Sequence, residues 1–328
     1  MNTSVIIVTL NRPDCVRRCL GCLFAQVPRP EQIIVVDASP GDETREVTAE
    51  FGGVLYLRNN NGYGRMTASR NIGLKRATGD IIAFLDDDAF AHPGWLENLL
   101  RTYAEPNVGA VGGRALNNQP GEDTAGVHEI GQLKPNGLLT GNFAADPGKI
   151  IEVDHIIGCN MSYRRSVLAA LGGLRPDYTG TEVREETDIC LRVKSLGYKI
   201  LFNPAACVDH IGAPQVKGQR FDARYAYYGQ RNHIVLLLRN FGPGAGVLWR
   251  YFGYSLWHYG LFEFFKRLGA ACVRLALIIF GSFQGIFSGV TIFVKLGCEA
   301  VRHDTEGKKI TQCLQDTSTE QAEDIVTV

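Results

Sequence analysis

Apolar and polar positions alternate in blocks over the first hundred residues of the chain. Four short apolar runs predict strands, at 5–10, 33–36, 54–57 and 81–85. Apolar residues recur at helical spacing over 13–24 and 67–76, and Pro13 stands in the first turn of the former. Strands that alternate with helices form a mostly parallel sheet covered by helices, so we expect an α/β fold.

The middle of the chain has a different pattern. Residues 115–149 are rich in Gly, Asn and Pro with little periodicity, which predicts long loops. Beyond them the pattern predicts an extended segment at 153–162, helices at 165–171 and 185–196, and a short strand at 199–203. Loops of this length inside a folded domain are usually functional.

The last third is aromatic and basic. Ten aromatic residues lie between Phe241 and Phe265, and an uncharged run at 275–294 is long enough to cross a bilayer. Within that run Gln284, Ser288 and Thr291 share one helical face, which favours a helix lying in the membrane interface. Packing against the rest of the chain as extra core is the alternative. Residues 304–328 are polar and predict a disordered tail.

Composition limits the class of protein. The 328 residues are 45% apolar and 21% charged, as in a globular protein, and the formal net charge is zero. Residues 215–303 nevertheless hold eleven Lys or Arg against three Asp or Glu. Because the aromatic residues there occur in apolar clusters, we expect attraction to a membrane surface and no nucleic-acid binding. Nine cysteines without paired spacing, and no basic region at the N-terminus, favour reduced thiols and a cytoplasmic catalytic domain.

Three consecutive aspartates at 86–88 directly follow the apolar run 81–85. Like charges at contact distance repel unless a cation neutralises them, so a divalent metal ion is one explanation and a solvated acidic turn is the other. Other polar groups also follow predicted strands or begin the helix at 185–196, namely Asn11, Asp37, Glu185, Glu186, Asp188 and His210. Sites in such sheets lie at the carboxyl ends of the strands. We therefore expect an acidic pocket suited to Mg²⁺ or Mn²⁺ with a diphosphate.

The order of short motifs resembles glycosyltransferase family 2, the inverting nucleotide-sugar enzymes of the GT-A fold. The resemblance covers about residues 3–215. The motifs are VIIVTLN (5–11), VVD (35–37), ASRNIGL (68–74), GDIIAFLDDD (79–88), PGWL (93–96), GCNMSYRR (158–165), LGGL (171–174), EETDICLR (185–192) and GY (197–198). No glycine-rich loop follows the first strand, which argues against an NAD-dependent oxidoreductase or a sugar nucleotidyltransferase.

The resemblance implies roles for the polar groups on the donor side. Thr9, Asn11 and Asp37 are expected to line the nucleoside pocket, and Arg70 to lie near the base and the diphosphate. The triplet at 86–88 corresponds to an Asp-x-Asp motif. Asp87 is then expected near the ribose, Asp86 near both donor and metal, and Asp88 on the metal, with His210 as a further ligand; a hydrogen-bonded core histidine is the alternative for His210.

On the acceptor side the resemblance makes Glu186 the general base, within an acidic helix start that also contains Glu185 and Asp188. Interaction with the helix dipole is the alternative for Glu186. A structural role that orients Arg192 is the alternative for Asp188. Residues 160–165 are expected to form a wall of the acceptor site, and a strand-to-helix junction with Arg164 and Arg165 solvated is the alternative.

We thus expect a GT-A type catalytic unit of two halves, with a helical, membrane-associated region and a tail. The boundaries are 1–114 for the nucleotide-sugar-binding half, 115–215 for the acceptor-binding half, 216–303 for the helical region and 304–328 for the tail. The expected reaction is an inverting transfer from a nucleotide-diphospho-sugar to a hydroxyl of a glycan or lipid-linked acceptor, at the cytoplasmic face of the membrane. A non-catalytic, membrane-anchored subunit that binds sugar nucleotides is the competing hypothesis.

Overall fold

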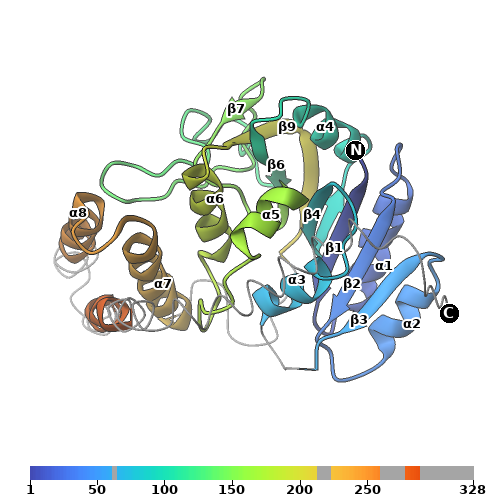
Figure 1. Cartoon of the computed structure of the whole chain (residues 1–328), viewed down its shortest axis with the longest axis horizontal. Coiled ribbons are helices and arrows are strands. Elements are labelled where there is room, and N and C mark those ends of the chain that lie inside the picture. The colour runs from blue at the N-terminus through green and yellow to red at the C-terminus, as the bar shows by residue number, and fades with distance from the viewer. Residues whose placement is uncertain (61–64, 213–222, 259–277, 289–328) are drawn as a thin grey trace.

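The computed structural model of the protein describes residues 1–60, 65–212, 223–258 and 278–288 (Figure 1). The helices are α1 Pro13–Phe24, α2 Glu43–Ala49, α3 Met66–Leu74, α4 Trp95–Thr102, α5 Arg165–Leu171, α6 Glu185–Ser195, α7 Ala223–Phe241 and α8 Gly246–Ser255. The strands are β1 Thr3–Thr9, β2 Gln32–Asp37, β3 Val54–Arg58, β4 Ile81–Asp86, β5 Ala89–Ala91, β6 Val108–Leu116, β7 Ile151–Glu152, β8 Asn160–Arg164 and β9 Lys199–His210.

These strands form one mixed sheet in the order β3-β2-β1-β4-β8-β6-β9-β5, with β7 beside β9. The first four strands pair in parallel, as the alternation of apolar runs and helices predicts. β8 runs antiparallel to both β4 and β6, so the sheet continues without a break into the second half of the chain. Helices cover both faces of this sheet (Figure 1), and the expected α/β fold is confirmed.

The two faces of the sheet hold two separate cores, because successive side chains of a strand point to opposite faces. Val5 and Ile7 of β1 pack on one face with Leu20 of α1. Ile6 of β1 packs on the other face with Leu74 of α3. The central strands are buried on both sides, which is why their sequences read as continuous apolar runs.

β6 is a strand that the apolar pattern does not predict, because its sequence is rich in glycine. A Cβ atom added at Gly113 would lie 1.7 Å from the carbonyl oxygen of Ala206 in β9. One added at Gly109 would lie 2.6 Å from Cβ of Tyr198. These glycines let neighbouring backbone and side chains approach the strand closely, which an apolar side chain would prevent.

β9 is longer than the predicted strand at 199–203, since it continues to His210. Its last residues pair with β5, with Ala89 opposite His210 and Ala91 opposite Val208. This register places His210 beside the turn that follows β4, and so beside the aspartate triplet.

The helices α7 and α8 lie at one end of the molecule, on the side away from β3 (Figure 1). Together with Leu133 and Leu138 they form a small core around Ile234, Leu237 and Tyr251. Among the described residues, no helix combines the length and the apolar character needed to span a bilayer. Of the uncharged run 275–294 the structure describes only 278–288, which is helical; the predicted tail at 304–328 lies outside the described residues.

Candidate active site

A cavity of about 550 Å³ opens at the carboxyl ends of β1 and β4. The segments that line it include the ends of β1, β4 and β9, the first turns of α3, the segments 139–143 and 155–159, and the residues 180–186 around the start of α6. Of the residues predicted from sequence, those that line the cavity are Thr9, Arg70, Asp86, Asp87, Asp88, Glu185, Glu186 and His210. One cavity therefore collects groups from five separate parts of the chain.

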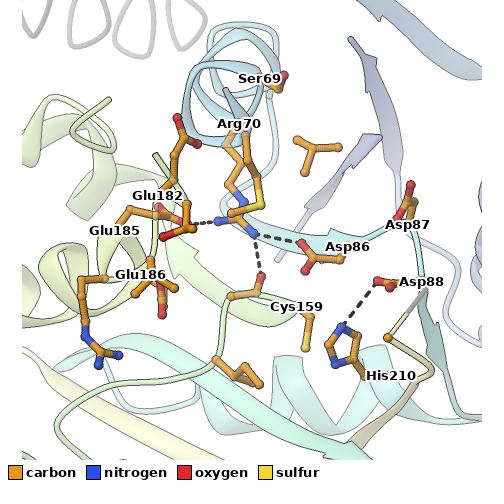
Figure 2. A pocket seen from close by; sticks show the side chains of 18 of the residues that line it. Ser69, Arg70, Asp86, Asp87, Asp88, Cys159, Glu182, Glu185, Glu186 and His210 are labelled. Carbon is orange, nitrogen blue, oxygen red and sulfur yellow. Dashed lines mark hydrogen bonds and ion pairs between the residues drawn. The ribbon is translucent and has the colours of Figure 1, made fainter. Parts of the chain in front are cut away.

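Asp86, Asp88 and His210 form a candidate metal centre at one end of the cavity (Figure 2). One ligand atom from each residue can be chosen so that all three lie within 4.8 Å of one another. Nε2 of His210 lies 3.5 Å from a carboxylate oxygen of Asp88. Carboxylate oxygens suit Mg²⁺ and Mn²⁺, so the residues present fit the expected ion.

Cations of the chain itself compensate the charge of this acidic end. Nη1 of Arg12 lies 2.9 Å from one carboxylate oxygen of Asp87 and 3.5 Å from one of Asp88. The hydroxyl of Thr9 donates to Asp87 at 2.7 Å. Burial raises the pKa of Asp87 to about 6, although Arg12 and Thr9 act in the opposite direction. Burial alone lowers the pKa of His210, but the contacts with Asp88 and with the thiol of Cys159 outweigh it and raise the pKa to about 10.

Arg70 joins the two ends of the cavity. Its side chain is 1% exposed, and it donates to Asp86 at 3.0 Å, to the carbonyl oxygen of Gly158 at 3.1 Å and to Glu185. Figure 2 shows Arg70 between Asp86 on one side and Glu185 on the other. Arg70 and Glu185 thus form a buried pair that ties α3 to the start of α6, and this pairing occupies both groups within the protein.

Glu186 lies at the end of the cavity opposite to Asp88 and His210 (Figure 2). It lines the cavity and makes no hydrogen bond or ion pair with any described residue. Its carboxylate is consequently free to accept a proton from a ligand. The alternative of a helix-dipole role is compatible with its place in the first turn of α6.

Asp188 does not line the cavity. It is 1% exposed and accepts hydrogen bonds from Arg175, from the hydroxyl of Tyr178 and from the amide of Asn240, each at 3.0 Å. Its other carboxylate oxygen lies 3.6 Å from Nη1 of Arg192. These contacts match the structural alternative that its sequence position suggested, since they join α6 to α7.

Two of the three residues expected in the nucleoside pocket also lie outside the lining of the cavity. Asp37 is fully buried and accepts hydrogen bonds from the hydroxyl of Tyr56 at 2.8 Å and from the amide and hydroxyl of Ser39. Asn11 adopts a φ of 55° and donates through its backbone amide to the hydroxyl of Ser39. Thr9, in contrast, lines the cavity directly.

The segment that precedes α6 has an unusual backbone. Gly180, Glu182 and Arg184 have φ values of 78°, 55° and 87°, and for the two non-glycine residues such a conformation costs on the order of 1 kcal/mol each. The amide of Asn232 in α7 donates to the carbonyl oxygens of Thr179 and Val183, each at 3.1 Å. α7 therefore fixes the segment that positions the acidic start of α6.

Among the cavity-lining residues that sequence reasoning missed are Arg12, His155 and Arg184. The only signal for Arg184 is its place directly before Glu185 and Glu186. No pattern in the sequence marks Arg12 or His155, because each is brought to the cavity by the turn or loop in which it lies.

Comparison with known proteins identifies the family of this chain. The model of glycosyl transferase family 2 matches residues 4–172, which is more than half of the chain. The chain belongs to glycosyl transferase family 2. The matched region contains the aspartate triplet and Arg70, while Glu186 and His210 lie beyond it. The predicted family is thereby confirmed, and the protein is a glycosyltransferase by class.

Curated relatives of the transferase are glycosyltransferases too. Over 64% of its length, this chain is 28% identical to the glucosyl-dolichyl phosphate glucuronosyltransferase of Haloferax volcanii. The matched region covers 69% of that relative. Over 70% of its length, this chain is 29% identical to the pre-mycofactocin glycosyltransferase of Mycobacterium tuberculosis. The chain spans 46% of the length of that second relative.

Solved structures confirm the fold of the transferase. The mannosyltransferase PcManGT of Pyrobaculum calidifontis, solved with GDP-Man and Mn²⁺, superposes with a TM-score of 0.56. The superposition covers 97% of this chain and 86% of that one, at 16% sequence identity. The similarity shows a shared GT-A type fold.

Proposed function

We propose that the transferase moves a sugar from a nucleotide-diphospho-sugar to a hydroxyl of a glycan or lipid-linked acceptor, with inversion at the anomeric carbon. One observation carries the proposal: a free carboxylate, Glu186, and a metal-ligating cluster, Asp86, Asp88 and His210, lie at opposite ends of one cavity. An inverting transfer needs a base on one side of the sugar and a leaving group on the other. The arrangement in Figure 2 supplies both positions.

In this mechanism Glu186 accepts the proton of the acceptor hydroxyl as that oxygen attacks. The base must be ionised and open to the ligand, and Glu186 makes no hydrogen bond or ion pair with the rest of the described chain. Glu185, in contrast, is held by Arg70, so we assign it to positioning the start of α6. Asp188 performs the same task from the other side of the helix through its contacts with α7.

The donor side divides into metal ligands and nucleoside contacts. Asp86, Asp88 and His210 would hold the Mg²⁺ or Mn²⁺ ion, which when bound neutralises the charge of the diphosphate leaving group. Asp87, next to Thr9 and Arg12, is assigned to the ribose side.

Three further residues are assigned to the part of the site that binds the donor. We assign Asn11 and Asp37 to the nucleoside pocket behind Thr9. Arg70 neutralises Asp86 at the diphosphate. Ser39 connects Asn11 and Asp37, because its amide donates to buried Asp37 and its hydroxyl accepts from the backbone amide of exposed Asn11.

Water can serve as the acceptor in the experiment that tests this function, because many transferases hydrolyse their donors slowly. The full chain is incubated with Mn²⁺ or Mg²⁺ and a panel of UDP-, GDP- and dTDP-sugars, and NMR records the first anomer released. We expect metal-dependent hydrolysis of one donor that releases the sugar with inverted configuration. Release with retained configuration would contradict the mechanism, and nucleotide binding without any turnover would favour the non-catalytic binding subunit.

We also propose that the membrane surface is a partner of the C-terminal helices. Trp249 of α8 and Phe280, Phe283 and Phe287 of the segment 278–288 are each more than half exposed. The rings of Trp249 and Phe252, and those of Phe252 and Phe283, have centroids 6.2 Å apart, so both helices contribute to one aromatic surface. Exposed aromatic residues in a basic region suit the interface of an anionic membrane.

Vesicle flotation tests this surface. Wild-type protein should float with vesicles containing phosphatidylglycerol, and a variant with Phe280→Ser, Phe283→Ser and Phe287→Ser should stay in the dense fraction. Ile150→Ser removes an exposed apolar residue from a loop of the catalytic unit and serves as the control. Equal flotation of the triple variant and the control would show that the aromatic surface does not bind membranes.

A further inference from the structure

Arg184 is an arginine of the cavity without a partner among the described residues. It stands directly before α6 and lines the cavity. It makes no hydrogen bond or ion pair with any residue in the described ranges, and its Nε atom is buried. Nε is the one nitrogen of its guanidinium that is both buried and unpartnered, so the two terminal nitrogens, which also have no partner among the described residues, are accessible to solvent.

Of the other arginines that line the cavity, Arg65 is exposed and the remaining three have partners in the chain. Arg12 pairs with Asp87 and Arg70 pairs with Glu185, while Arg224 donates to the carbonyl oxygen of Gly180 at 2.9 Å. A charged group that loses water without gaining a partner is unfavourable, so chains usually pair or fully expose it. Arg184 is left with donors that a ligand can use.

The backbone conformation of Arg184 also supports a ligand-binding role for its side chain. Its φ of 87° lies in the left-handed region, which glycine adopts without steric cost and an arginine does not. Glycine would therefore fit this position as well as or better than arginine for folding alone. The side chain needs a separate reason to be there, and its place in the cavity supplies one.

His155 completes this end of the cavity. It is 5% exposed, lines the cavity and is hydrogen-bonded through Nε2 to the carbonyl oxygen of Thr140 at 2.9 Å. Since a carbonyl oxygen only accepts, Nε2 carries the proton and Nδ1 is a lone-pair acceptor, which has no partner in the described chain. Burial and the charge of Arg184 lower the pKa of His155 to about 4, so the ring is neutral and adds no countercharge.

The position of Arg184 next to Glu186 indicates which of the two substrates Arg184 contacts. The two residues are separated by Glu185 alone, and both line the cavity. Figure 2 shows Glu186 at the end away from Asp88 and His210, where the acceptor hydroxyl must lie if Glu186 is the base. An unpaired cation next to an unpaired carboxylate suits a ligand that presents an anionic group and a hydroxyl together.

We propose that Arg184 is the anion-binding residue of the acceptor subsite, where it binds a phosphate or carboxylate group of an acceptor whose hydroxyl meets Glu186. The proposal rests on the proposed function, because it assumes that the end containing Glu186 receives the acceptor. Arginine binds phosphate and carboxylate groups through paired N–H donors, which gives both affinity and orientation.

Arg184→Gly is the variant that separates binding from folding, since it removes the side chain from a conformation that glycine prefers. NMR titration of the full chain uses three anionic probes, two of which have a neutral counterpart. Citronellyl phosphate against citronellol tests a lipid phosphate, methyl glucuronide against methyl glucoside tests a sugar carboxylate, and inorganic phosphate tests a free anion. Each pair is measured with and without the nucleoside diphosphate and Mn²⁺.

For the wild type we expect one of the two anionic ligands to bind at least about tenfold more tightly than its neutral counterpart. Arg184→Gly should abolish that preference, with an unchanged melting temperature and unchanged binding of nucleoside diphosphate with Mn²⁺. Arg184→Lys should keep part of the preference, because it keeps the charge. Arg101→Ala, which removes an exposed arginine outside the cavity, should keep all of it.

Three results would overturn the assignment: equal binding of anionic and neutral probes to the wild type, a preference that survives in Arg184→Gly, or a comparable loss of nucleoside diphosphate binding in that variant. Inorganic phosphate that binds as tightly as either larger probe would also overturn it, since the site would then recognise a free anion and not an acceptor. Failure of the wild type to bind any nucleoside diphosphate would count against the proposed function alone, because the probe ratios are also measured without nucleotide.

Discussion

The two ends of the cavity differ in how the protein treats charge. At the metal end, every acid has a cationic neighbour from the chain: Arg12 for Asp87 and Asp88, and Arg70 for Asp86. At the other end, Glu186 and Arg184 lie two residues apart and neither pairs with any described residue. One end is electrostatically complete before a ligand arrives, and the other depends on the ligand for its partners.

The difference reflects two chemical tasks. A cluster of carboxylates must be stabilised in the folded chain before it can bind a cation, because unpaired like charges would raise one another's pKa and oppose folding. A base must keep its lone pairs free for the proton that it removes. Under the proposed mechanism, charge compensation marks the end that would hold the ion, and its absence marks the end that would supply the base.

The most damaging substitution should be Asp88→Asn at the metal end. It removes one of the three candidate ligands together with the partner of His210. We expect transfer or donor hydrolysis to fall by at least about 1000-fold and Mn²⁺-dependent nucleotide binding to disappear in calorimetry. Asp123→Asn, at an exposed loop position, is the control and should change neither quantity.

Glu186→Gln should separate the two ends. Turnover should fall by about 100- to 1000-fold because the base is lost, while nucleotide and Mn²⁺ bind as in the wild type. Glu46→Gln is matched to it, since Glu46 is also acidic, lies in the first turn of a helix and stands outside the cavity. If both variants keep full turnover and lose only a little stability, Glu186 serves the helix dipole and the comparison of the two ends fails.

Asn232→Ala tests whether α7 holds the reactive end in place. Asn232 is fully buried, and its truncation removes the hydrogen bonds to the carbonyl oxygens of Thr179 and Val183, which we expect to lower the free energy of unfolding by about 2 kcal/mol. Urea unfolding measures this loss, with Asn107→Ala at an exposed position as the control. Metal-dependent nucleotide binding should survive in folded Asn232→Ala, and its loss would mean that the two ends are not separable.

The smallest effect concerns pH. His155 faces Arg184, Asp154 and His233, and its pKa is lowered to about 4 by burial and then by Arg184. In the unfolded chain the ring takes up a proton near pH 6.5, so the stability due to its neutral form is complete above that pH and is lost as pH falls toward 4. Between pH 6.5 and 5, wild type should lose about 1.5 kcal/mol more than His155→Gln in urea unfolding. An equal loss in both proteins would show that the ring takes up its proton in the folded state.

Much of the fold follows from the sequence because its central strands are buried on both faces. The apolar runs at 5–10 and 81–85 have no other explanation than strands between two helical layers, and the polar residues that end them mark one edge of the sheet. β6 could not be predicted in that way. Its glycines at 109, 112 and 113 are selected by close approach of other parts of the chain, which is a property of the folded state and not of the local pattern.

The site was less predictable than the fold for a similar reason. Motifs mark the residues whose order along the chain is fixed, such as Asp88 and Glu186. The charge pairs of the site join distant parts of the chain: Arg12 meets Asp87 across 75 residues, and Arg70 is separated from Glu185 by 115. No periodicity connects such residues, so their contacts emerge only from the three-dimensional arrangement.

The hydrogen bonds from Asn232 have a consequence for how this enzyme can be recombined with its relatives. α7 follows β9 in the chain, so the boundary of a segment exchanged between relatives would naturally be placed before α7. Yet the carbonyl oxygens of Thr179 and Val183 take their donors from α7, and Asp188 takes one from Asn240. A chimera designed to exchange acceptor preference should therefore take residues 177–241 from one parent. Helix α6 and helix α7, which contacts it, then come from the same protein.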